Sequence, residues 1–319
     1  MKILFVWTGV TSYMADCWRE LAERSGVELK VIIEKHSSGA EIDVAKTLFG
    51  FDAQVVSSIA DVSLGDWVPD VIFAVGWHSK TVRAIVNDSG LKNQTPKLKL
   101  VCCFDMPWRW QLRCMAARFV LHRFLCHYDA AFVPGGRAAR YARWLGFKKI
   151  HKGLFSLDTS RFANEPSKQG FMFIGRNAPE KRIDVIKAAY EMYKQKGGRW
   201  TLDIYGGSNF VQPSEVPNLY RSHACLLLAS SFDPWPLVML EATSAGLMVI
   251  ASNRCGNVEE LGAKSVPYGN VSAMADAMLE AEKGNIKAAG HERTAQYDSR
   301  VWADHVVAIC DELIGDKAC

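Results

Sequence analysis

Short apolar runs alternate with stretches of helical period along the chain, and this alternation constrains the fold more than any other feature. In the first half, the apolar runs lie at residues 2–7, 29–33, 70–75, 98–104 and 130–133. The helical stretches between them lie at residues 13–24, 79–86, 108–126 and 137–145. Because buried strands joined by crossover helices pair in parallel, the pattern predicts an α/β fold with a doubly wound parallel sheet.

The same pattern restarts after Gly170. Apolar runs follow at residues 171–174, 201–205, 224–229 and 248–252, with helices predicted from about 179 to 196 and through Glu241. The polar stretch 159–170 (TSRFANEPSKQG) is typical of a linker. The 319 residues therefore predict two Rossmann-like domains facing each other across a cleft, with boundaries at 1–165 and 169–300. Residues 301–319 predict a last amphipathic helix, which we expect to pack back on the first domain.

The composition excludes several classes of protein. The chain is 49% hydrophobic, enough to bury large cores and too much for a disordered protein. No apolar run approaches the ~20 residues that a membrane-spanning helix needs, and the first run is too short for the core of a signal peptide. Nine cysteines without a C-x-x-C pair indicate reduced thiols and no zinc site. We therefore expect a cytoplasmic protein without a bound metal.

Positive charge is concentrated in one segment. Residues 107–152 contain ten Lys or Arg and a single acid, Asp129, so this segment carries +9 while the whole chain carries +4. The remainder of the chain is therefore −5. A local basic field of this kind attracts anions, such as phosphate, anionic lipid or nucleic acid.

Within that segment, the helical stretch 108–126 interleaves aromatic residues with arginines. One interpretation is an interfacial helix that holds the protein on the inner face of an anionic membrane. A second is a nucleic-acid groove with stacking residues, which we consider the least favoured of the three. The third is a crossover helix whose arginines reach past an apolar stem to solvent.

The end of the first predicted strand excludes one common ligand. It reads FVWTGVTSY, with the single glycine Gly9, so the G-x-G-x-x-G fingerprint of dinucleotide binding is absent. This argues against an NAD-dependent oxidoreductase. Farther along, His78 lies in VGWHS at the end of another predicted strand, on the side where we expect the cleft, and is a candidate contact for a substrate.

The segment FIGRNAPEKRID (173–184) predicts a strand end, a short loop and a helix start. Asn177 is the predicted N-cap, with Pro179 in the first helical turn. Arg176 and Lys181 then lie near a helix N-terminus, where a bound anion would offset the unfavourable position of two cations. We expect both to converge on a phosphate; the alternative is that Lys181 is a solvated surface residue.

A second segment, SSFDPWPLVMLEATSAG (230–246), carries two acids eight residues apart. Asp233 follows a predicted strand, and Glu241 lies on the helix after it. Carboxylates in these places can accept hydrogen bonds from sugar hydroxyls. Taken separately, Asp233 is equally well explained as an N-cap and Glu241 as a solvated helix acid.

Together the motifs F-I-G-R-x(4)-K, Y-G-G and S-x-x-D-P-W-x(5)-E-A-x-x-A-G, followed by V-I-A-S, resemble the donor half of retaining glycosyltransferases of family 4, which have the two-domain GT-B fold. The stretches TSYMADCWREL, DAAFVPGGRAARYARWLGF and KGLFSLDTSRF resemble the first domain of members that assemble bacterial surface polysaccharide and lipopolysaccharide. The resemblance covers nearly the whole chain.

This resemblance implies a function and a site. The donor is a nucleoside diphosphate sugar, UDP- or GDP-linked, and the acceptor a glycan or lipid-linked glycan; no metal or other cofactor is needed. Arg176 and Lys181 would hold the diphosphate, Asp233 the transferred sugar and Glu241 the ribose. The further donor contacts implied are Gly9, Gly175, Gly206, Ser230, Trp235, Leu237 and Val238. The acceptor-side candidates are Tyr13, His78, Asp105 and Trp108.

The chain departs from the family pattern at three places. Asp233 stands where a Glu is usual, Pro236 where a Gly is usual, and Phe104–Asp105 where a strand often ends in a His. Two alternatives to polysaccharide synthesis follow. One is a nucleotide-sugar-binding or nucleic-acid-associated protein of the same fold that has lost catalysis; the other is a glycosyltransferase acting on DNA.

Overall fold

The computed structural model describes residues 1–9, 11–34, 47–75, 77, 79–87, 98–109, 111–163, 167, 169–207, 211–212 and 214–315. The chain divides into two compact units. The first unit combines Met1–Asp158 with Tyr297–Cys319, and the second is Thr159–Gln296. The unit boundaries thus lie after residues 158 and 296. The sequence pattern predicted them near residues 165 and 300.

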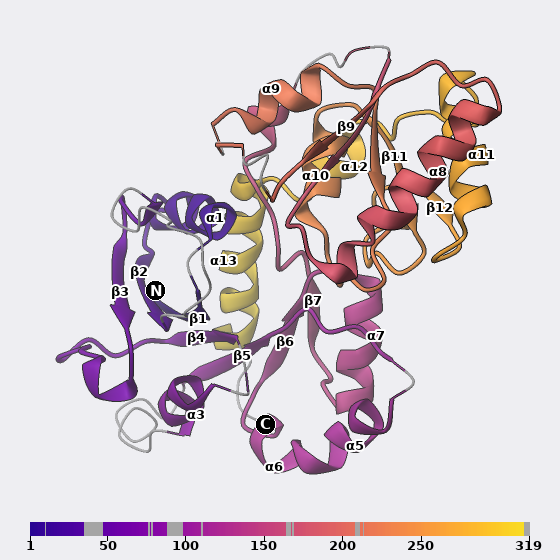
Figure 1. The fold of residues 1–319 in the computed structure, drawn as a ribbon. Helices are drawn as coiled ribbons and strands as arrows, with labels where there is room; N and C mark the ends of the chain where they lie inside the picture. Colours follow the sequence, from indigo (N-terminus) through magenta and orange to yellow (C-terminus); the bar gives the residue numbers. More distant parts are fainter. Residues whose placement is uncertain are drawn as a thin grey trace. The chain divides into compact units, whose positions relative to one another are not determined.

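The first unit is built on seven parallel strands in the order β3-β2-β1-β4-β5-β6-β7 (Figure 1). The strands are β1 (Lys2–Thr8), β2 (Glu28–Glu34), β3 (Asp52–Val56), β4 (Val71–Val75), β5 (Lys99–Cys103), β6 (Ala130–Val133) and β7 (Ile150–Lys152). The apolar runs predicted all but the two edge strands. β3 buries only Val56 and β7 buries no residue, so neither has the continuous apolar run that marks a central strand.

Helices cover both faces of this sheet. The helices of the first unit are α1 (Ser12–Ala22), α3 (Lys80–Asn87), α5 (Leu112–Val120), α6 (His122–Leu125), α7 (Gly136–Leu145) and α13 (Ser299–Gly315), with a 3₁₀ turn at Ile59–Asp61. On one face, α1 and α13 pack over Phe5 and Phe73, whose rings stack at 4.7 Å. On the other, α3 and α7 cover a second core that includes Val82 and Tyr141.

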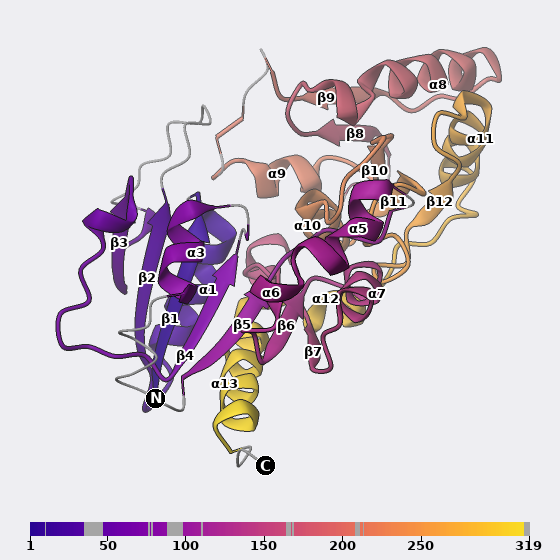
Figure 2. The ribbon, with the colours of Figure 1, turned by 90° about the horizontal axis from the view of Figure 1, so that it is seen from below.

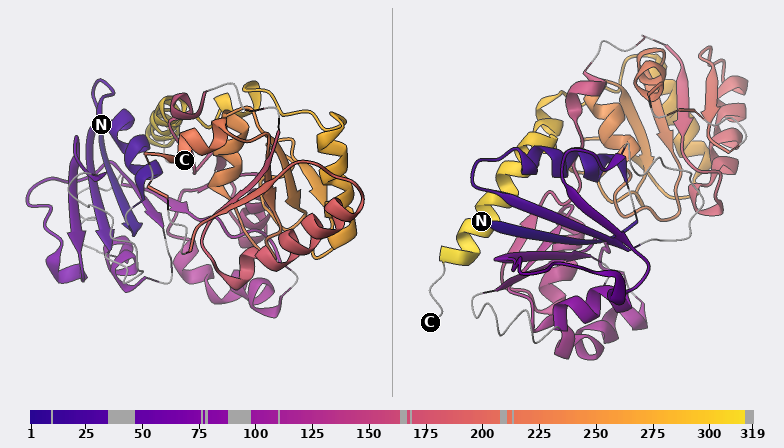
Figure 3. Two further views of the ribbon diagram at one scale, coloured as in Figure 1. Left: turned by 45° about the horizontal axis from the view of Figure 1, so that its top comes forward. Right: turned by 90° about the vertical axis from the view of Figure 1, so that its left-hand side faces the viewer.

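The last helix, α13, lies beside α1 in the first unit (Figure 3). Trp302 is fully buried and its Nε1 donates to the Leu154 carbonyl at 3.0 Å. Arg24, just after α1, binds Asp304 of α13 through Nε at 2.7 Å. The end of the chain therefore supplies part of the core of the unit that begins the chain.

The single helix predicted over 108–126 is wrong. The Gln111 amide bonds to the Arg109 carbonyl in a tight turn, so the helical ladder of α5 begins only at Leu112. α5 ends at Val120, and a second short helix, α6, begins at His122 after the cap residue Leu121. Cys114 of α5 and Leu125 of α6 each bury a side chain against the core beneath α7, so two short helices replace one long one.

The second unit has five parallel strands in the order β12-β11-β10-β8-β9 (Figure 2). The strands are β8 (Phe171–Ile174), β9 (Leu202–Tyr205), β10 (Cys225–Leu228), β11 (Met248–Ser252) and β12 (Lys264–Val266). The helices are α8 (Ile183–Gln195), α9 (Val216–Arg221), α10 (Leu237–Ser244), α11 (Val271–Glu282) and α12 (Glu292–Ala295), with 3₁₀ turns η2 (Thr159–Phe162) and η3 (Pro179–Lys181). β8 and β11 match their predicted bounds residue for residue.

Each sheet reverses its winding at one point. In the first unit this point lies between β1 and β4, and in the second between β8 and β10. In open α/β sheets, ligands bind at the carboxyl ends of the strands beside such a point. The topology therefore places one candidate site in each unit.

Candidate active site

Two glycines bring the loops after β8 and β9 together. The Gly175 amide donates to the Tyr205 carbonyl at 3.1 Å. A Cβ on Gly206 would lie 1.8 Å from the Gly175 carbonyl oxygen, and the φ of Gly206 is +119°. No other residue fits at 206 without moving this backbone. The Y-G-G motif is therefore explained by a close backbone approach at the edge of the site.

The loop after β8 continues into a 3₁₀ turn, and the predicted helix start is wrong. Ala178, not Asn177, caps η3, and α8 begins at Ile183 after Arg182 adopts a left-handed conformation at φ 50°. A left-handed residue other than Gly costs roughly 1–2 kcal/mol. The Arg182 guanidinium donates two hydrogen bonds to the Asp184 carboxylate and a third to the Tyr268 hydroxyl. These side-chain contacts stabilise the left-handed backbone at Arg182.

Residues from the loop after β10 hold the 3₁₀ turn in place. Ser231 donates to the Glu180 carbonyl through both its amide (2.8 Å) and its hydroxyl (3.2 Å). Lys181 then reaches Asp233: Nζ donates to Oδ2 at 2.6 Å, and the two side chains are only 17% and 12% exposed. The structure thus pairs two of the predicted catalytic residues across the winding reversal between β8 and β10.

The backbone at Asp233 is also fixed by the segment after β11. Asp233 forms an isolated parallel bridge with Cys255, and the Gly256 amide donates to the Asp233 carbonyl at 2.9 Å. A Cβ on Gly256 would lie 1.7 Å from the Pro234 carbonyl oxygen. Sequence reasoning missed Cys255 and Gly256, although NRCGN follows a strand end just as Asp233 does.

Cys255 lies beside the ion pair as a neutral thiol. Burial raises its pKa to about 12, and the negative charge of Asp233 adds to the rise. Lys181 and hydrogen bonds with Ser252 and Ser230 oppose it. The Ser252 hydroxyl also donates to the Ser230 carbonyl at 2.6 Å, so Ser230 is part of this buried support rather than an open surface residue.

Glu241 is not a solvated helix acid. The hydroxyl of Tyr220 donates to its Oε2 at 2.7 Å, and Tyr220 itself is fully buried. Burial raises the pKa of the Glu241 carboxyl, while the Tyr220 hydrogen bond and the charge of Arg161 partly oppose this rise. Burial and the neighbouring Glu241 raise the pKa of Tyr220 well above its usual value. Sequence reasoning missed both residues: Tyr220 lies outside the motifs, and Arg161, although it lies in the stretch KGLFSLDTSRF, was not connected with Glu241.

The start of α10 lies next to Asp233. Its N-cap is Pro236, whose carbonyl accepts from the Asn257 side-chain amide at 3.1 Å. Leu237 and Val238 form the first turn, and first-turn amides have no acceptor inside their own helix. These amides and the partial positive charge of the helix end favour an anion. Trp235 lies just before them with a buried side chain.

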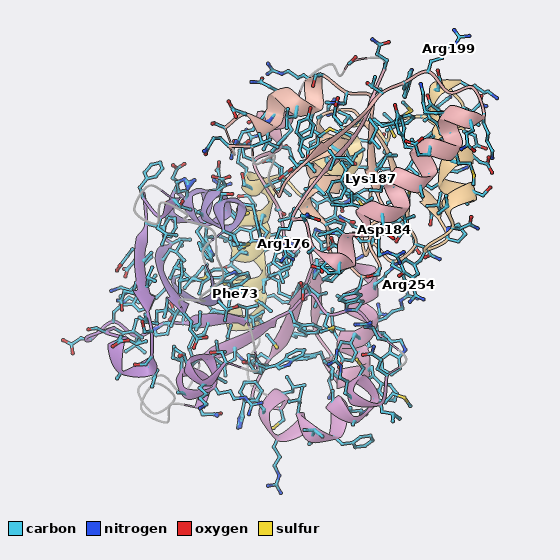
Figure 4. All side chains as sticks on the ribbon, in the orientation of Figure 1. Phe73, Arg176, Asp184, Lys187, Arg199 and Arg254 are labelled. Atoms are coloured by element: carbon cyan, nitrogen blue, oxygen red, sulfur yellow. The ribbon has the colours of Figure 1, made fainter. Side chains whose placement is uncertain are left out.

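Arg176 behaves differently from Lys181. Its side chain is 80% exposed on the loop after β8 (Figure 4). Its guanidinium contacts Glu180 at 3.2 Å rather than the Lys181–Asp233 pair. Each cation therefore contacts a separate acid in this structure, and their convergence on a phosphate stays a prediction.

The first unit has a pocket at its own winding reversal. A cavity of about 270 Å³ opens at the carboxyl ends of β1, β4 and β5. Its lining residues are Trp7, Thr8, Thr11, Tyr13, Val75, Trp77, Phe104, Asp105, Met106 and Phe155. Five aromatic rings and one carboxylate thus surround a space large enough for a sugar ring.

Tyr13 and Asp105, two of the acceptor-side candidates, both line this pocket. Burial raises the pKa of Tyr13 to about 12; the Asp105 charge adds to the rise and a hydrogen bond from Thr11 opposes it. The third candidate, Trp108, packs instead against Trp144 of α7, with ring centroids 4.9 Å apart. His78 lies outside the described residues.

Gly9 follows β1 at the same end of the sheet as the pocket. Its φ is +81°, its amide donates to the Glu34 carbonyl at 3.0 Å, and a Cβ there would meet no atom within 4 Å. The requirement for glycine here is therefore conformational. The open space beside it leaves the backbone accessible.

In the part of the chain that the structure describes, no group of three or more His, Cys, Asp or Glu is placed to hold a metal ion. No helix in the described ranges is long and apolar enough to cross a membrane.

Residues 208–297 match the sequence model of the family described as "Glycosyl transferases group 1". This stretch contains Asp233 and Glu241 but not the loop after β8. Among curated protein sequences, none matches the chain significantly.

Several solved structures are similar along their whole length. The N-terminal domain of Candida albicans trehalose-6-phosphate phosphatase has a TM-score of 0.73 at 12% identity, covering 98% of this chain and 97% of its own. The lipopolysaccharide outer core galactosyltransferase WaaB has a TM-score of 0.69 at 13% identity, covering 98% and 100%. Anabaena Alr3699/HepE in complex with UDP has a TM-score of 0.68 at 13% identity, also covering 98% and 100%. The chain therefore has the GT-B fold, and the family match supports glycosyl transfer.

Proposed function

We propose that this chain is a retaining glycosyltransferase that moves a sugar from a UDP- or GDP-linked donor to a glycan or lipid-linked glycan, in the assembly of surface polysaccharide. The observation that carries the proposal is the Lys181–Asp233 pair at the winding reversal of the second unit. The similar Anabaena protein forms a complex with UDP, which supports a nucleotide as a ligand of this chain.

The diphosphate of the donor would lie between Lys181 and the first turn of α10. Negative charge grows on the leaving diphosphate as the bond to the sugar breaks, so groups that meet this charge lower the barrier. Lys181 would exchange its contact with Asp233 for a phosphate oxygen. Arg176 is exposed and contacts Glu180, and it would turn onto the same phosphates when the donor binds. These groups supply the positive charge that a metal would otherwise provide.

Asp233 would then accept hydrogen bonds from hydroxyls of the transferred sugar. Its backbone is held by the segment after β11, so the carboxylate keeps its place when Lys181 leaves it. A carboxylate near the reacting carbon also stabilises the positive charge that develops on the sugar. Asp233 is one methylene shorter than the Glu usual in the family, and we propose that this length selects the sugar.

Glu241 would bind the ribose of the donor nucleotide. The Tyr220 hydroxyl donates to Oε2 of Glu241 at 2.7 Å, and the other carboxylate oxygen would accept a hydrogen bond from a ribose hydroxyl. Because Tyr220 is buried and fixed, it orients the Glu241 carboxylate before the donor arrives. Gly175, Gly206, Leu237 and Val238 would contribute backbone contacts to the same ligand.

The acceptor would bind in the aromatic pocket of the first unit. Sugar rings present apolar C–H faces that stack on aromatic side chains, and their hydroxyls donate to carboxylates. Tyr13 and Asp105 would make these polar contacts, beside the hydroxyls of Thr8 and Thr11 in the same lining. A sugar at the end of a lipid-linked glycan would bring the enzyme to the cytoplasmic face of a membrane.

Donor hydrolysis tests the proposal without knowledge of the acceptor. Purified protein is first screened for thermal shift against UDP, GDP and their common sugar conjugates, since a ligand at 100 times its Kd stabilises by about 2.7 kcal/mol. The best donor is then followed by NMR for slow release of the sugar, and the anomer formed first reports retention or inversion. Binding without hydrolysis or transfer would support the non-catalytic alternative, and absence of any nucleotide binding would overturn the proposal.

A further inference from the structure

Helix α5 turns its apolar residues outward. Leu112 is 85% exposed and Phe119 and Val120 are each 77% exposed, while Cys114 is the residue of this helix that is buried. Among the described elements of the first unit, α5 contacts α6 and α7 (Figure 1). Large apolar side chains gathered on one exposed helix face mark a surface that another body covers.

Helical geometry divides α5 into two faces. At 100° per residue, Leu112 and Phe119 lie on one side within about 20° of each other. Cys114 and Ala117 lie on the opposite side, where both pack on the core beneath α7. Arginines flank the outward apolar strip: Arg113 follows Leu112, and Arg118 precedes Phe119 and lies over the Trp144 ring at 5.7 Å.

The charge around α5 is almost entirely positive. Between residues 107 and 152 the one acid is Asp129, and Asp129 is bound to Lys99 at 3.2 Å and to the Leu100 amide. Arg113 contacts the neutral Gln111 rather than an acid. Lys149 of this segment pairs with Glu312 at 3.2 Å, whereas Arg113 and Arg118, the two arginines on α5, contact Gln111 and the Trp144 ring, so the charge beside the apolar strip stays positive.

We propose that α5 docks the protein on an anionic lipid bilayer, with Leu112, Phe119 and Val120 in the interface and the arginines beside them at the headgroups. An amphipathic helix with aromatic and aliphatic residues on one side and arginines at its flanks has the pattern of an interfacial anchor. A nucleic acid would meet the arginines but would leave the apolar strip uncovered. A second copy would bring two segments of charge +9 together. An anionic bilayer would cover the apolar strip and would also bind the arginines through its headgroups.

Vesicle co-sedimentation tests the docking with the full chain and needs no sugar donor. The vesicles are phosphatidylcholine alone or with about 30% phosphatidylglycerol, at low and at physiological salt. We expect binding to the anionic vesicles only. Leu112→Ser and Phe119→Ser should each weaken it at least about tenfold, because each removes a side chain from an apolar interface. Arg113→Gln and Arg123→Gln should each weaken it about fivefold.

Matched controls lie elsewhere on the chain. Phe49 is also an exposed aromatic residue, 63% exposed, and Phe49→Ser should leave binding unchanged. Lys187 and Arg199 lie on the second unit (Figure 4). The double variant Lys187→Gln with Arg199→Gln removes as many positive charges from the chain as Arg113→Gln and Arg123→Gln remove together. It should leave binding unchanged as well. Circular dichroism checks that each variant keeps the fold; Leu112 and Phe119 are both so exposed that we expect no loss.

Three results would overturn the proposal. The first is equal sedimentation of wild type and the Leu112 and Phe119 variants with anionic vesicles. The second is retention on duplex DNA that depends on the arginines alone, which would assign the surface to nucleic acid. The third is a dimer in solution that these serine variants dissociate while vesicle binding is absent. The proposed transferase activity is read separately, since donor hydrolysis should be the same in all α5 variants.

Discussion

Lys181 donates from Nζ to Oδ2 of Asp233 at 2.6 Å, although the two residues are 52 positions apart in the chain. The loops that carry the two residues are joined by hydrogen bonds: Ser231, two residues before Asp233, donates through its amide and its hydroxyl to the carbonyl of Glu180, the residue before Lys181. The pair is largely shielded from water, so changes to either partner affect folding as well as chemistry.

Lys181→Ala should therefore act on both stability and turnover. We expect kcat/KM for the best donor to fall at least about 100-fold, because the charge that Lys181 meets grows in the transition state. Stability should fall by about 1–3 kcal/mol, because Asp233 loses its partner in a shielded place. Urea unfolding and donor turnover measure the two effects.

The double variant Lys181→Ala with Asp233→Ala separates them. It should recover most of the lost stability and none of the activity. Arg176→Ala is the exposed counterpart: its unfolding should match wild type while kcat/KM falls. Turnover of the Lys181 variant within about a factor of two of wild type would exclude a transition-state contact.

Changes at Asp233 test its proposed contact with the sugar. Asp233→Asn should lose most activity, because a neutral amide accepts weaker hydrogen bonds from hydroxyls and stabilises no positive charge. Asp233→Glu should lose activity on the native donor and gain some on a common hexose donor, since it extends the carboxylate by one methylene. The Kd for the bare nucleoside diphosphate should change little in either variant. If the Asp233→Asn enzyme is as active as wild type, Asp233 does not contact the sugar and serves only to form the turn.

Replacing Glu241 by Gln should have opposite effects on the stability of the fold and on the affinity for the nucleotide. Its pKa is raised by burial, so the unfolded chain ionises first as pH rises, and the folded state loses stability between the ordinary carboxyl pKa and the raised one. Glu241→Gln keeps an acceptor for Tyr220 and removes the buried charge. We expect a higher Tm than wild type at pH 8, with the difference shrinking as the pH falls below the ordinary carboxyl pKa of about 4.3, where both states become protonated.

The same variant should bind nucleotide about 10- to 100-fold more weakly, because a charge-assisted hydrogen bond to the ribose is lost. Calorimetry with the nucleoside diphosphate at pH 8 measures this loss. Unchanged affinity would remove Glu241 from the donor site, and a Tm below that of wild type at pH 8 would contradict the assigned cost of its burial.

Gly206→Ala tests the close approach at the edge of the donor site. The new Cβ would lie 1.8 Å from the Gly175 carbonyl oxygen, so the loop carrying Arg176 must move. We expect a loss of stability above about 2 kcal/mol and a strong loss of donor binding. Gly197→Ala is the control, because Gly197 also has a positive φ, +88°, but open space around it. It should cost only about 1 kcal/mol and leave donor binding unchanged.

Much of the fold was predictable from local pattern. The apolar runs located every strand of the first sheet except β3 and β7, the two edges, because only central strands are buried on both faces. Helix starts were less predictable. The 3₁₀ turn at Pro179 and the left-handed Arg182 depend on contacts with Ser231, Asp184 and Tyr268, two of which lie far away in the chain.

The site was predictable in part. Lys181, Asp233 and Glu241 lie in motifs with fixed spacing, so they could be singled out without a structure. Tyr220 and Gly256 were missed, because each acts on a motif residue from a different segment: Tyr220 through a hydroxyl on Glu241 and Gly256 through an amide on Asp233. Arg176 was expected to bind a phosphate together with Lys181, which stays a prediction; in this structure its guanidinium contacts Glu180.

Local periodicity and short-range spacing were enough to predict the five central strands of the first sheet, the division into two α/β units and the motif residues, because these depend on neighbouring positions. The contact of Lys181 with Asp233 and the exposure of Leu112 and Phe119 on α5 depend on the whole fold. The physical reason is the same in both cases. Periodicity shows which side of a helix is apolar and which residues are charged, but the partner of each is set by the packing of segments distant in sequence.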